Sequence, residues 1–419
     1  MSAVVRSLAD GLRCQRCATR FPTGWLFEGC PACADGPWAA NLAVEYESAG
    51  AKEAWRHLSG RGVWRYAAFL PVANAGARIS LGEGATPLLP LNVAPWRAAW
   101  VKNETLNPTW SYKDRQCSVA VSKAREGNAS VIAASSMGNH GASAAAYAAR
   151  AGLQAVVLTR EDVDPNTVAF MEVYGATVIR TTRRGRWALL AYGVREFGWY
   201  SVSTYTQAPT GNPYGTEGYK TIAFEIFEQL GRVPAVVVVP TSYGEGLSGI
   251  WAGFRQLAAI GVGKSLPRMV AAEPAGGAPL AFALDHGLNR VVEVPCYDTI
   301  ATSIAATTAA DSALLALRQS GGASVRVPDV DTLEAQRELA ASGLFLEPSG
   351  AAALAALKAL PARCSDIDPG RDLAVMIGTG GGLRQVQLLL GRLPEGPAIT
   401  PEGAALREVL SPDLIRRNR

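Results

Sequence analysis

Long apolar runs are absent from this sequence of 419 residues, and no stretch approaches the about 18 apolar residues that a membrane helix requires. The N-terminal segment MSAVVRSLADGLRCQRC has only a short apolar run before it turns polar, so it lacks the hydrophobic region of a signal peptide. These absences predict a cytoplasmic protein with no membrane partner. Cysteines stay reduced in that compartment, so disulfide bonds are not expected.

A strong net charge is also missing. The 40 Lys and Arg residues nearly balance the 36 Asp and Glu residues, which leaves a formal net charge of +4 that is dispersed along the chain. Such a balance does not predict a nucleic-acid partner. Low-complexity segments are absent as well, because the 43 Gly and 25 Pro residues are scattered between apolar runs. The composition is that of a turn-rich globular protein, and the length indicates roughly two to three domains.

Four cysteines near the N-terminus form two close pairs with the spacing C-x2-C-x12-C-x2-C, namely Cys14, Cys17, Cys30 and Cys33. Two such pairs joined by a hairpin can place four thiolates around one Zn²⁺ ion, as in a zinc ribbon. No histidine lies among them and no ligand position is spare, so the site is expected to be closed and structural. The alternative is four thiols that hold no metal.

Apolar runs followed by a polar turn and a helical pattern occur three times. The predicted strands are Val131–Ala134, Ala235–Val239 and Leu373–Ile377. The helices after them are expected at Ala142–Arg150, from about Leu247 and from about Leu383. Continuous apolar strands that alternate with helices predict an α/β fold, in which parallel sheets are covered by helices on both faces.

The turns after these strands are expected at the carboxyl ends of the sheet, where backbone N–H groups and helix N-termini bind anions. In the turn SYGEG, Gly244 and Gly246 would let the backbone approach a phosphate closely. Lys113 lies in NPTWSYKDR, upstream of a Gly-Asn-His turn and a Thr-Gly-Gly-Gly turn. Pyridoxal phosphate needs such parts: an amine for its aldehyde, amides for its phosphate, and partners for its ring hydroxyl and ring nitrogen.

Five segments carry a family resemblance: NPTWSYKDR, SSMGNHGASAAAYAARAG, GNPYGTEGYKTIAFEI, LEPSGAAALAAL and GTGGGLR. In this order they resemble the threonine synthase branch of the fold type II, tryptophan-synthase-like pyridoxal-phosphate enzymes. The resemblance runs from about Leu12 to Arg384 and includes the cysteine-paired ribbon. It implies a small-molecule amino-acid substrate bound in a cleft between two domains, and similar enzymes are usually homodimers.

The resemblance also implies a domain layout. The zinc ribbon would span residues 1–40, and a large domain that binds the cofactor would be built from residues 41–115 and 213–392. A small domain would be inserted at residues 116–212, and residues 393–419 would form a C-terminal tail.

Carried over to this sequence, the resemblance makes Lys113 the Schiff-base lysine, which would also transfer the α-proton. Asn139 would lie beside the ring oxygen, and the Thr379 hydroxyl would face the ring nitrogen. The phosphate-binding turn would consist of Ser242, Tyr243, Gly244, Glu245 and Gly246. The loop for the substrate carboxylate would consist of Ser136, Met137, Gly138, Asn139 and His140. Trp110 would lie near the pocket mouth, either in contact with the substrate or packed at the domain interface.

This chain departs from the family where the substrate is recognised. Threonine synthases commonly read N-P-x-R-x-E-G-Q-K-T, with an arginine that binds the phosphate of O-phosphohomoserine, whereas Gly215 stands at that position here. His140 is instead similar to the histidine of serine and threonine dehydratases and serine racemases. Arg183, Arg184 and Arg186 form either a substitute anion site or a solvated cluster.

The predicted function is a pyridoxal-phosphate-dependent lyase or replacement enzyme, acting on an amino acid with a leaving group at Cβ or Cγ. Because Gly215 offers no side chain to a phosphate, O-phosphohomoserine is not expected to bind in the usual way. The alternatives are a genuine threonine synthase, a serine or threonine dehydratase or β-replacement synthase, and a scaffold without activity whose ribbon contacts other molecules.

Overall fold

The computed structural model describes residues 6–35, 38–389, 398, 400–401 and 409. The chain divides into two units, Met1–Gly382 and Leu383–Arg419, and the sheets described below belong to the first. In the second unit, the described residues include the end of a 3-10 helix, Gly382–Leu389. The C-terminal tail expected at 393–419 lies almost wholly outside the described residues.

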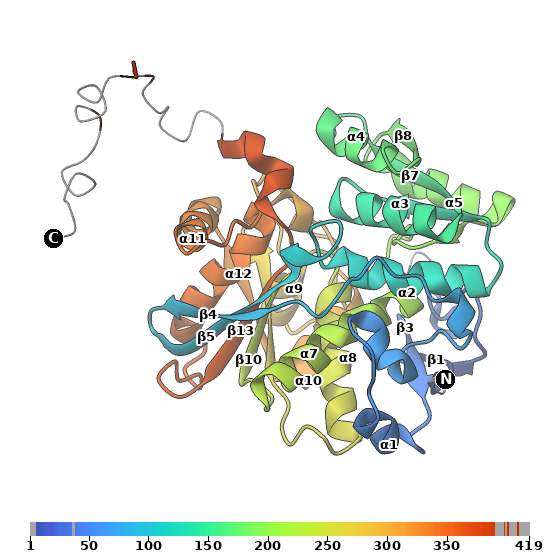
Figure 1. Cartoon of the computed structure of the whole chain (residues 1–419), viewed down its shortest axis with the longest axis horizontal. Helices are drawn as coiled ribbons and strands as arrows, with labels where there is room; N and C mark the ends of the chain where they lie inside the picture. Colours follow the sequence, from blue (N-terminus) through green and yellow to red (C-terminus); the bar gives the residue numbers. More distant parts are fainter. Residues whose placement is uncertain (1–5, 36–37, 390–397, 399, 402–408, 410–419) are drawn as a thin grey trace. The chain divides into compact units, whose positions relative to one another are not determined.

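The larger sheet has six strands in the order β12-β11-β10-β13-β5-β4 (Figure 1). Its strands are β4 (Leu88–Val93), β5 (Trp96–Asn103), β10 (Val236–Pro240), β11 (Arg268–Pro274), β12 (Ala323–Val327) and β13 (Leu373–Gly378). All neighbouring pairs are parallel except β4 with β5, which form an antiparallel hairpin at one edge. The parallel body of this sheet was predicted from the apolar runs, whereas the antiparallel edge strand was not.

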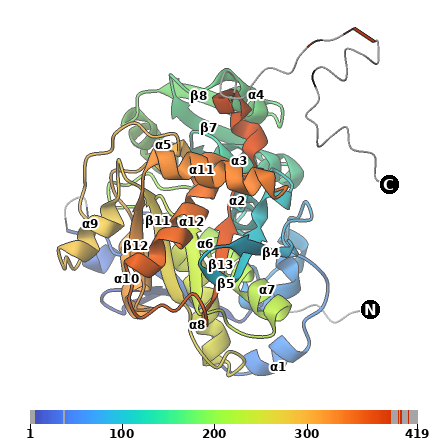
Figure 2. The same ribbon diagram turned by 90° about the vertical axis from the view of Figure 1, so that its left-hand side faces the viewer.

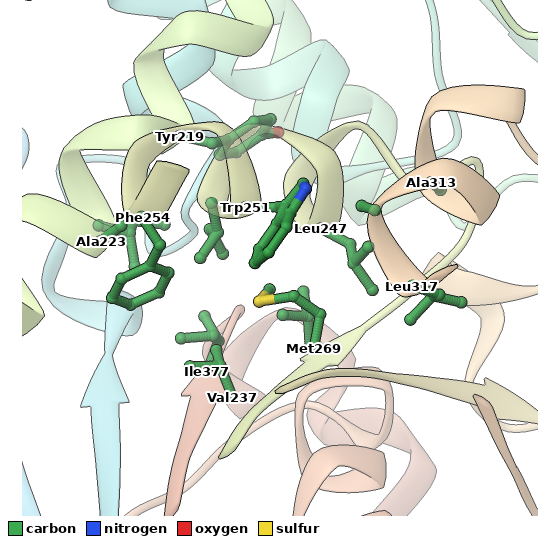
Figure 3. Close-up of a cluster of buried hydrophobic side chains, with 14 of the residues drawn as sticks. Tyr219, Ala223, Val237, Leu247, Trp251, Phe254, Met269, Ala313, Leu317 and Ile377 are labelled. Carbon is green, nitrogen blue, oxygen red and sulfur yellow. The ribbon is translucent and has the colours of Figure 1, made fainter. Parts of the chain in front are cut away.

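Helices cover both faces of this sheet. Successive strand residues point to opposite faces, so the apolar strands present side chains to helices on each side. Val237 and Val239 of β10 pack in a cluster with α7 (Lys220–Leu230), α8 (Glu245–Ala259) and α10 (Asp311–Gln319). Figure 3 shows part of this cluster, with Trp251 of α8 above Met269 of β11 and Phe254 of α8 to the left. Val236 and Val238 face the other side, where α11 (Asp329–Ala341) and α12 (Pro348–Ala359) pack, which Figure 2 brings to the front.

The smaller sheet is parallel throughout and has the order β8-β7-β6-β9. Its strands are β6 (Val131–Ser135), β7 (Gln154–Arg160), β8 (Thr177–Thr181) and β9 (Tyr200–Ser201). Its helices are α2 (Lys113–Glu126), α3 (Asn139–Ala151), α4 (Pro165–Glu172) and α5 (Gly185–Phe197). Alanine-rich faces let α2 and α3 pack closely on each other and on β6. The chain then returns through α6 (Pro213–Thr216) to α7.

A third, antiparallel sheet lies near the N-terminus, with the order β2-β1-β3. Its strands are β1 (Ala9–Cys14), β2 (Arg20–Phe21) and β3 (Leu42–Tyr46). The short helices α1 (Ala51–Arg56) and α9 (Pro279–Asp285) complete the described elements, together with several 3-10 turns. Because β3 pairs with β1, this sheet includes residues beyond the expected ribbon boundary at 40.

The predicted α/β class with helix-covered parallel sheets is confirmed. The expected strands match β6, β10 and β13 within about a residue, but α3 begins at Asn139 and α8 at Glu245, earlier than predicted. Both helices therefore begin within the segments that carry the candidate site residues. The smaller sheet is formed by the consecutive strands β6 to β9, and the proposed domain boundaries stay predictions. Among the described residues, no helix has both the length and the apolar character needed to cross a membrane.

Candidate active site

Lys113 is the first residue of α2, and the backbone of the segment before it is held by two other segments. The Tyr112 N–H donates to the Thr379 carbonyl at 2.9 Å, and the Gly381 N–H donates to the Trp110 carbonyl at 2.9 Å. The Glu347 N–H in turn donates to the Gly380 carbonyl at 3.0 Å. Main-chain hydrogen bonds thus connect three segments: the residues before the lysine, the turn after β13 and the start of α12.

The Lys113 amine lies over two tyrosine rings, with Nζ 5.1 Å from the Tyr112 ring centre and 5.7 Å from that of Tyr219. Its side chain is half-buried. The positive charge reaches two titratable neighbours: it adds to the burial that lowers the pKa of His140, and it opposes the burial that raises the pKa of Glu245. The lysine therefore faces the loop after β6 and the turn after β10.

His140 presents a neutral nitrogen to the site. Burial and the charge of Lys113 hold the pKa of His140 well below its usual value, and the ring donates to the Val202 backbone. Its Nε2 is buried and has no hydrogen-bond partner among the described residues. The bond to Val202 therefore belongs to Nδ1, which leaves the Nε2 lone pair as an acceptor.

Asn139 begins α3 and contacts the start of α12, because its Nδ2 donates to Oε1 of Glu347 at 2.9 Å. Gly380 lies against both side chains: a Cβ there would be 2.7 Å from that Glu347 oxygen and 3.1 Å from Asn139 Nδ2. Only a glycine allows this approach without displacing its neighbours. Asn139, Glu347 and the turn that contains Thr379 thus meet at one place.

The loop between β6 and α3 is organised by Ser136. Its buried hydroxyl oxygen accepts from the N–H groups of Gly138 at 3.1 Å and Gly141 at 2.8 Å, at the N-terminus of α3. Met137 lies at the side of this loop, with its sulfur 3.9 Å from Nη1 of Arg160 at the end of β7. The predicted carboxylate-binding residues therefore surround a helix N-terminus, which favours an anion.

The turn from Ser242 to Gly246 leads from β10 into α8, and its glycines are required by close packing. Gly244 has φ +93°, and a Cβ there would lie 2.2 Å from the Ala313 Cβ. A Cβ on Gly246 would lie 2.7 Å from the ring of Tyr112. The first turn of α8 presents backbone N–H groups that have no partners inside the helix. Ser242 and Tyr243 lie half-buried beside them.

Glu245 places a carboxyl group in this turn. The turn was predicted to bind a phosphate, and that prediction did not consider the negative charge of Glu245. The carboxyl is directed to the neighbouring segment, since a Cβ on Gly211 would lie 1.9 Å from Oε1 and the Asn212 N–H donates to the carboxyl. Burial raises the pKa of Glu245, which favours its neutral form. The side chain therefore leaves the N–H groups of the turn uncovered.

Comparison with known proteins identifies the family of this site. Residues 79–380 match the model of the family described as "Pyridoxal-phosphate dependent enzyme". The chain belongs to this family. It is 33% identical over 409 residues to a threonine synthase of Methanocaldococcus jannaschii, and the aligned region covers 95% of this chain and 98% of the relative. It is 35% identical over 369 residues to a threonine synthase of a Synechocystis species, with 86% and 89% covered.

Solved structures agree on the fold. Maize serine racemase aligns with a TM-score of 0.61 at 22% identity, covering 70% of this chain and 86% of that one. The processed form of threonine deaminase isoform 2 from Solanum lycopersicum aligns with a TM-score of 0.62 at 20% identity, covering 79% and 94%. The predicted resemblance to fold type II pyridoxal-phosphate enzymes with threonine synthase relatives is confirmed.

The residues present fit pyridoxal phosphate, the cofactor of this family. Three of the polar side-chain atoms that are buried without a hydrogen-bond partner in the described part of the chain belong to segments of this site: Ser111 Oγ, His140 Nε2 and Glu245 Oε1. Each belongs to a segment that contacts or contains a predicted site residue. The charge of Lys113 acts on His140 and Glu245, and α8 offers free N–H groups at the glycine turn. Unpartnered buried polar atoms are uncommon, so their presence in three segments of the site is consistent with a polar ligand there.

Trp110 lies at the rim of the site, 45% exposed, with its ring stacked on that of Phe170 in α4 at 5.1 Å. Its φ of +60° is in the left-handed region, which favours glycine. A tryptophan there costs roughly 1 kcal/mol of backbone strain. The stack joins the segment of Lys113 to a helix of the smaller sheet.

A buried charge network beside Lys113 was not predicted. Arg115 is fully buried and donates from Nε and Nη2 to Glu104 at 2.6 and 2.8 Å. It also donates from Nη1 and Nη2 to Glu225 at 2.7 and 2.8 Å, and Lys102 donates to Glu225 at 2.6 Å. Although burial lowers it, these carboxylates hold the pKa of Arg115 well above its usual value. The network fixes the first turn of α2 to β5 and α7.

Gly215 lies on α6, packed against α2, so the space beside it is already filled. A Cβ there would lie 3.0 Å from Gln116 Cγ and 3.1 Å from the Ala120 Cβ. The Gln116 side chain is itself held, because it donates to the Val202 carbonyl and accepts from the Tyr219 hydroxyl. A larger side chain at this position would have to displace Gln116 or Ala120.

The four N-terminal cysteines lie together. Their Sγ atoms are all within 4.8 Å of one another, and both the Cys14–Cys33 and Cys17–Cys30 sulfur pairs are 3.7 Å apart. Four thiolates at about 2.3 Å from a Zn²⁺ ion would be about 3.8 Å apart. A hydrogen bond with Thr19 is the main cause that lowers the pKa of Cys17 to about 6, whereas burial raises the pKa of Cys30 and the bond with Cys17 raises that of Cys33 to about 12. The cluster has the donors and the size for one such ion.

Proposed function

We propose that this protein is a pyridoxal-phosphate-dependent lyase or replacement enzyme for an amino acid with a leaving group at Cβ or Cγ. The observation that carries this proposal is the position of Lys113, whose charge acts on both His140 and Glu245 from the start of α2. An amine placed between a substrate loop and a phosphate-binding turn suits covalent attachment of a cofactor aldehyde.

When bound, pyridoxal phosphate acts as an electron sink that stabilises negative charge at the substrate Cα. Lys113 Nζ would remove the α-proton and return it. Asn139, fixed by Glu347, would orient the ring through its amide, and the Thr379 hydroxyl would face the ring nitrogen without forcing its protonation. The N-terminus of α3 and the loop around Ser136 would hold the substrate carboxylate.

His140 supports a second step at the substrate side chain. Its neutral Nε2 is an acceptor, so it would accept a hydrogen bond from a hydroxyl group on Cβ or from a water molecule that adds there. This observation favours serine or threonine dehydration, or β-replacement, as the second candidate reaction. Genuine threonine synthase activity is the third, supported by the relatives but opposed by the packing around Gly215.

Two measurements test the proposal. The visible absorbance of the lysine-bound cofactor should be present in the purified protein and vanish in Lys113→Ala, whereas a protein without this band would be the inactive scaffold. Incubation with O-phosphohomoserine, O-phosphoserine, threonine and serine, with phosphate, ammonia and new amino acids followed, then identifies the reaction. Rapid phosphate release with threonine formation would contradict the inference from Gly215.

We also propose that the cysteine cluster holds one structural Zn²⁺ ion. Four thiolate donors leave no open coordination position for a water molecule, which is typical of structural and not of catalytic zinc.

A further inference from the structure

We propose that Arg186, assisted by Arg183, binds an anionic group on the side chain of the substrate, with a phosphate monoester as the best match. This inference rests on the proposed function, because it assigns a substrate class to the same site. It replaces the solvated-cluster alternative for Arg186 and provides a cation that Gly215 does not.

Arg186 lies at the carboxyl edge of the smaller sheet. The strands β6, β7 and β8 are parallel and adjacent, so the segments after them emerge at one edge. The substrate loop Ser136–His140 follows β6, Arg160 ends β7, and Arg186 is in the first turn of α5 after β8. Ligands of open α/β sheets bind at this edge.

The burial of Arg186 separates it from its neighbours. It is 6% exposed, whereas Arg183 and Arg184 are exposed. Its Nε has no hydrogen-bond partner, and within the described part of the chain no carboxylate forms an ion pair with it. Burial lowers the pKa of Arg186, and the charges of Arg160 and Arg183 add to this effect, whereas Tyr243 and the Asp162 carboxylate oppose it. A buried guanidinium that forms no ion pair is costly, and the Asp162 carboxylate is already bonded to Arg160, so an anion supplied by a ligand would stabilise Arg186.

The surroundings of Arg186 place this anion between the two walls of the site. Its charge acts on Tyr243 in the glycine turn, and the ring of the adjacent Trp187 lies 5.9 Å from the Tyr243 ring. On the other side, Arg160 contacts Met137 of the substrate loop. Arg160 already pairs with Asp162, which leaves Arg186 and Arg183 for a further anion.

Two phosphates could reach this position, one on the substrate and one on the cofactor. The cofactor phosphate has the N–H groups of α8, which belongs to the larger sheet. Arg186 belongs to the same sheet as the substrate loop. The placement therefore favours the substrate phosphate.

The test compares O-phospho-L-serine with L-serine on the cofactor-loaded protein, with half-saturation read from the change in cofactor absorbance. Arg186→Gln should weaken the binding of O-phospho-L-serine about 10- to 100-fold and the binding of L-serine by less than about 2-fold. Arg186→Lys should keep part of the preference, because the charge stays but the paired donors are lost. Arg184→Gln, a change in an exposed neighbour, should alter neither ligand. Thermal melting of each variant verifies its folding.

Three results would overturn the inference: equal weakening of both amino acids, an effect of Arg184→Gln as large as that of Arg186→Gln, or a loss of pyridoxal-phosphate affinity in Arg186→Gln that matches the loss for O-phospho-L-serine. Calorimetry of inorganic phosphate with cofactor-free protein tests the same site independently. Binding in the wild type that is weakened in Arg186→Gln supports the inference, and equal binding overturns it. Failure of the wild type to take up pyridoxal phosphate would instead refute the proposed function.

Discussion

Asn139 and Glu347 join helices of the two larger sheets at the candidate active site, with Nδ2 of the amide 2.9 Å from Oε1 of the carboxylate. One residue begins α3 beside the smaller sheet, and the other immediately precedes α12 beside the larger one. The bond uses one amide hydrogen of Asn139 and fixes which way its side chain faces. The asparagine that would meet the cofactor ring therefore depends on a residue 208 positions later in the chain.

Removal of the Glu347 carboxylate should loosen Asn139 and weaken cofactor binding. Glu347→Ala is expected to raise the dissociation constant of pyridoxal phosphate about tenfold, the value of one charge-assisted hydrogen bond. Glu347→Gln keeps an oxygen acceptor and should change it by less than about threefold. Absorbance titration of cofactor-free protein measures both. Equal affinity in the wild type and Glu347→Ala would show that the bond does not position Asn139.

Restoring the family's arginine should harm this chain. Gly215→Arg is expected to destabilise the fold by about 1–3 kcal/mol, because Gln116 and Ala120 occupy the space beside the glycine. Urea unfolding measures the loss. Adding Gln116→Ala to Gly215→Arg should recover part of it. A single Gly215→Arg variant that is as stable as the wild type and converts O-phosphohomoserine to threonine would contradict this account.

Neutralising the buried arginine should be costly. Arg115→Met leaves the carboxylates of Glu104 and Glu225 without their main partner, so we expect a loss of about 3–5 kcal/mol in the free energy of unfolding. The matched control is Lys358→Met in the more exposed ion pair with Glu338, where about 1 kcal/mol or less is expected. Similar losses in the two variants would mean that burial adds nothing to the network.

Asp114 should give stability a defined pH dependence. Burial raises the pKa of Asp114 to about 6, although Ser143 and Thr109 donate to the carboxylate. A folded-state pKa above the unfolded value means that the folded protein binds this proton more tightly. Its contribution is therefore fully present below about pH 4 and is lost as the pH rises through about 6.

Asp114→Asn removes the titrating group, so the fall in unfolding free energy between about pH 4 and pH 6 should become shallower. Urea unfolding at several pH values measures this slope. The slope is compared, and not the absolute stability, because the amide also changes the hydrogen bonds with Thr109 and Ser143. An unchanged slope would assign the pH dependence to other groups.

The cysteine cluster should hold one zinc ion per chain. Cys30→Ser is expected to lose it, because Cys30 is fully buried and its removal leaves three thiolates. Cys364→Ser, a change outside the cluster, should keep the full zinc content. Atomic emission measures the metal, and chelation of the wild type should lower its melting temperature. A protein with all four cysteines that binds no zinc would support the metal-free alternative.

Much of this molecule could be predicted from the sequence. Continuous apolar strands predict a parallel sheet because both faces of β10 and β13 are buried, and this was correct. The starts of α3 and α8 were placed too late, because a glycine, Gly138 or Gly244, precedes each helix and no side-chain cap marks either N-terminus. Periodicity detects the apolar body of a helix and not its polar first turn.

The unpredicted parts of the site depend on contacts between distant residues. The partner of Asn139 lies in LEPSG, a segment noted only for its resemblance. Arg186 is buried beside two exposed arginines, and the adjacent Trp187 packs against Tyr243, which spacing alone does not reveal. The spacing of Lys113 and Arg115 was a usable signal for the buried network. The two residues are separated by one position, and in the helix that begins at the lysine the arginine points toward the larger sheet.

The frame around Lys113 consists of backbone bonds that link Trp110 and Tyr112 to the turn after β13. Every amino acid except proline carries the same amide and carbonyl, so these bonds do not depend on which side chains stand at those positions. The location of the amine is thereby uncoupled from the chemistry of its neighbours. Aromatic residues can therefore be substituted beside the lysine and change which molecules contact it, while the position of the lysine stays the same.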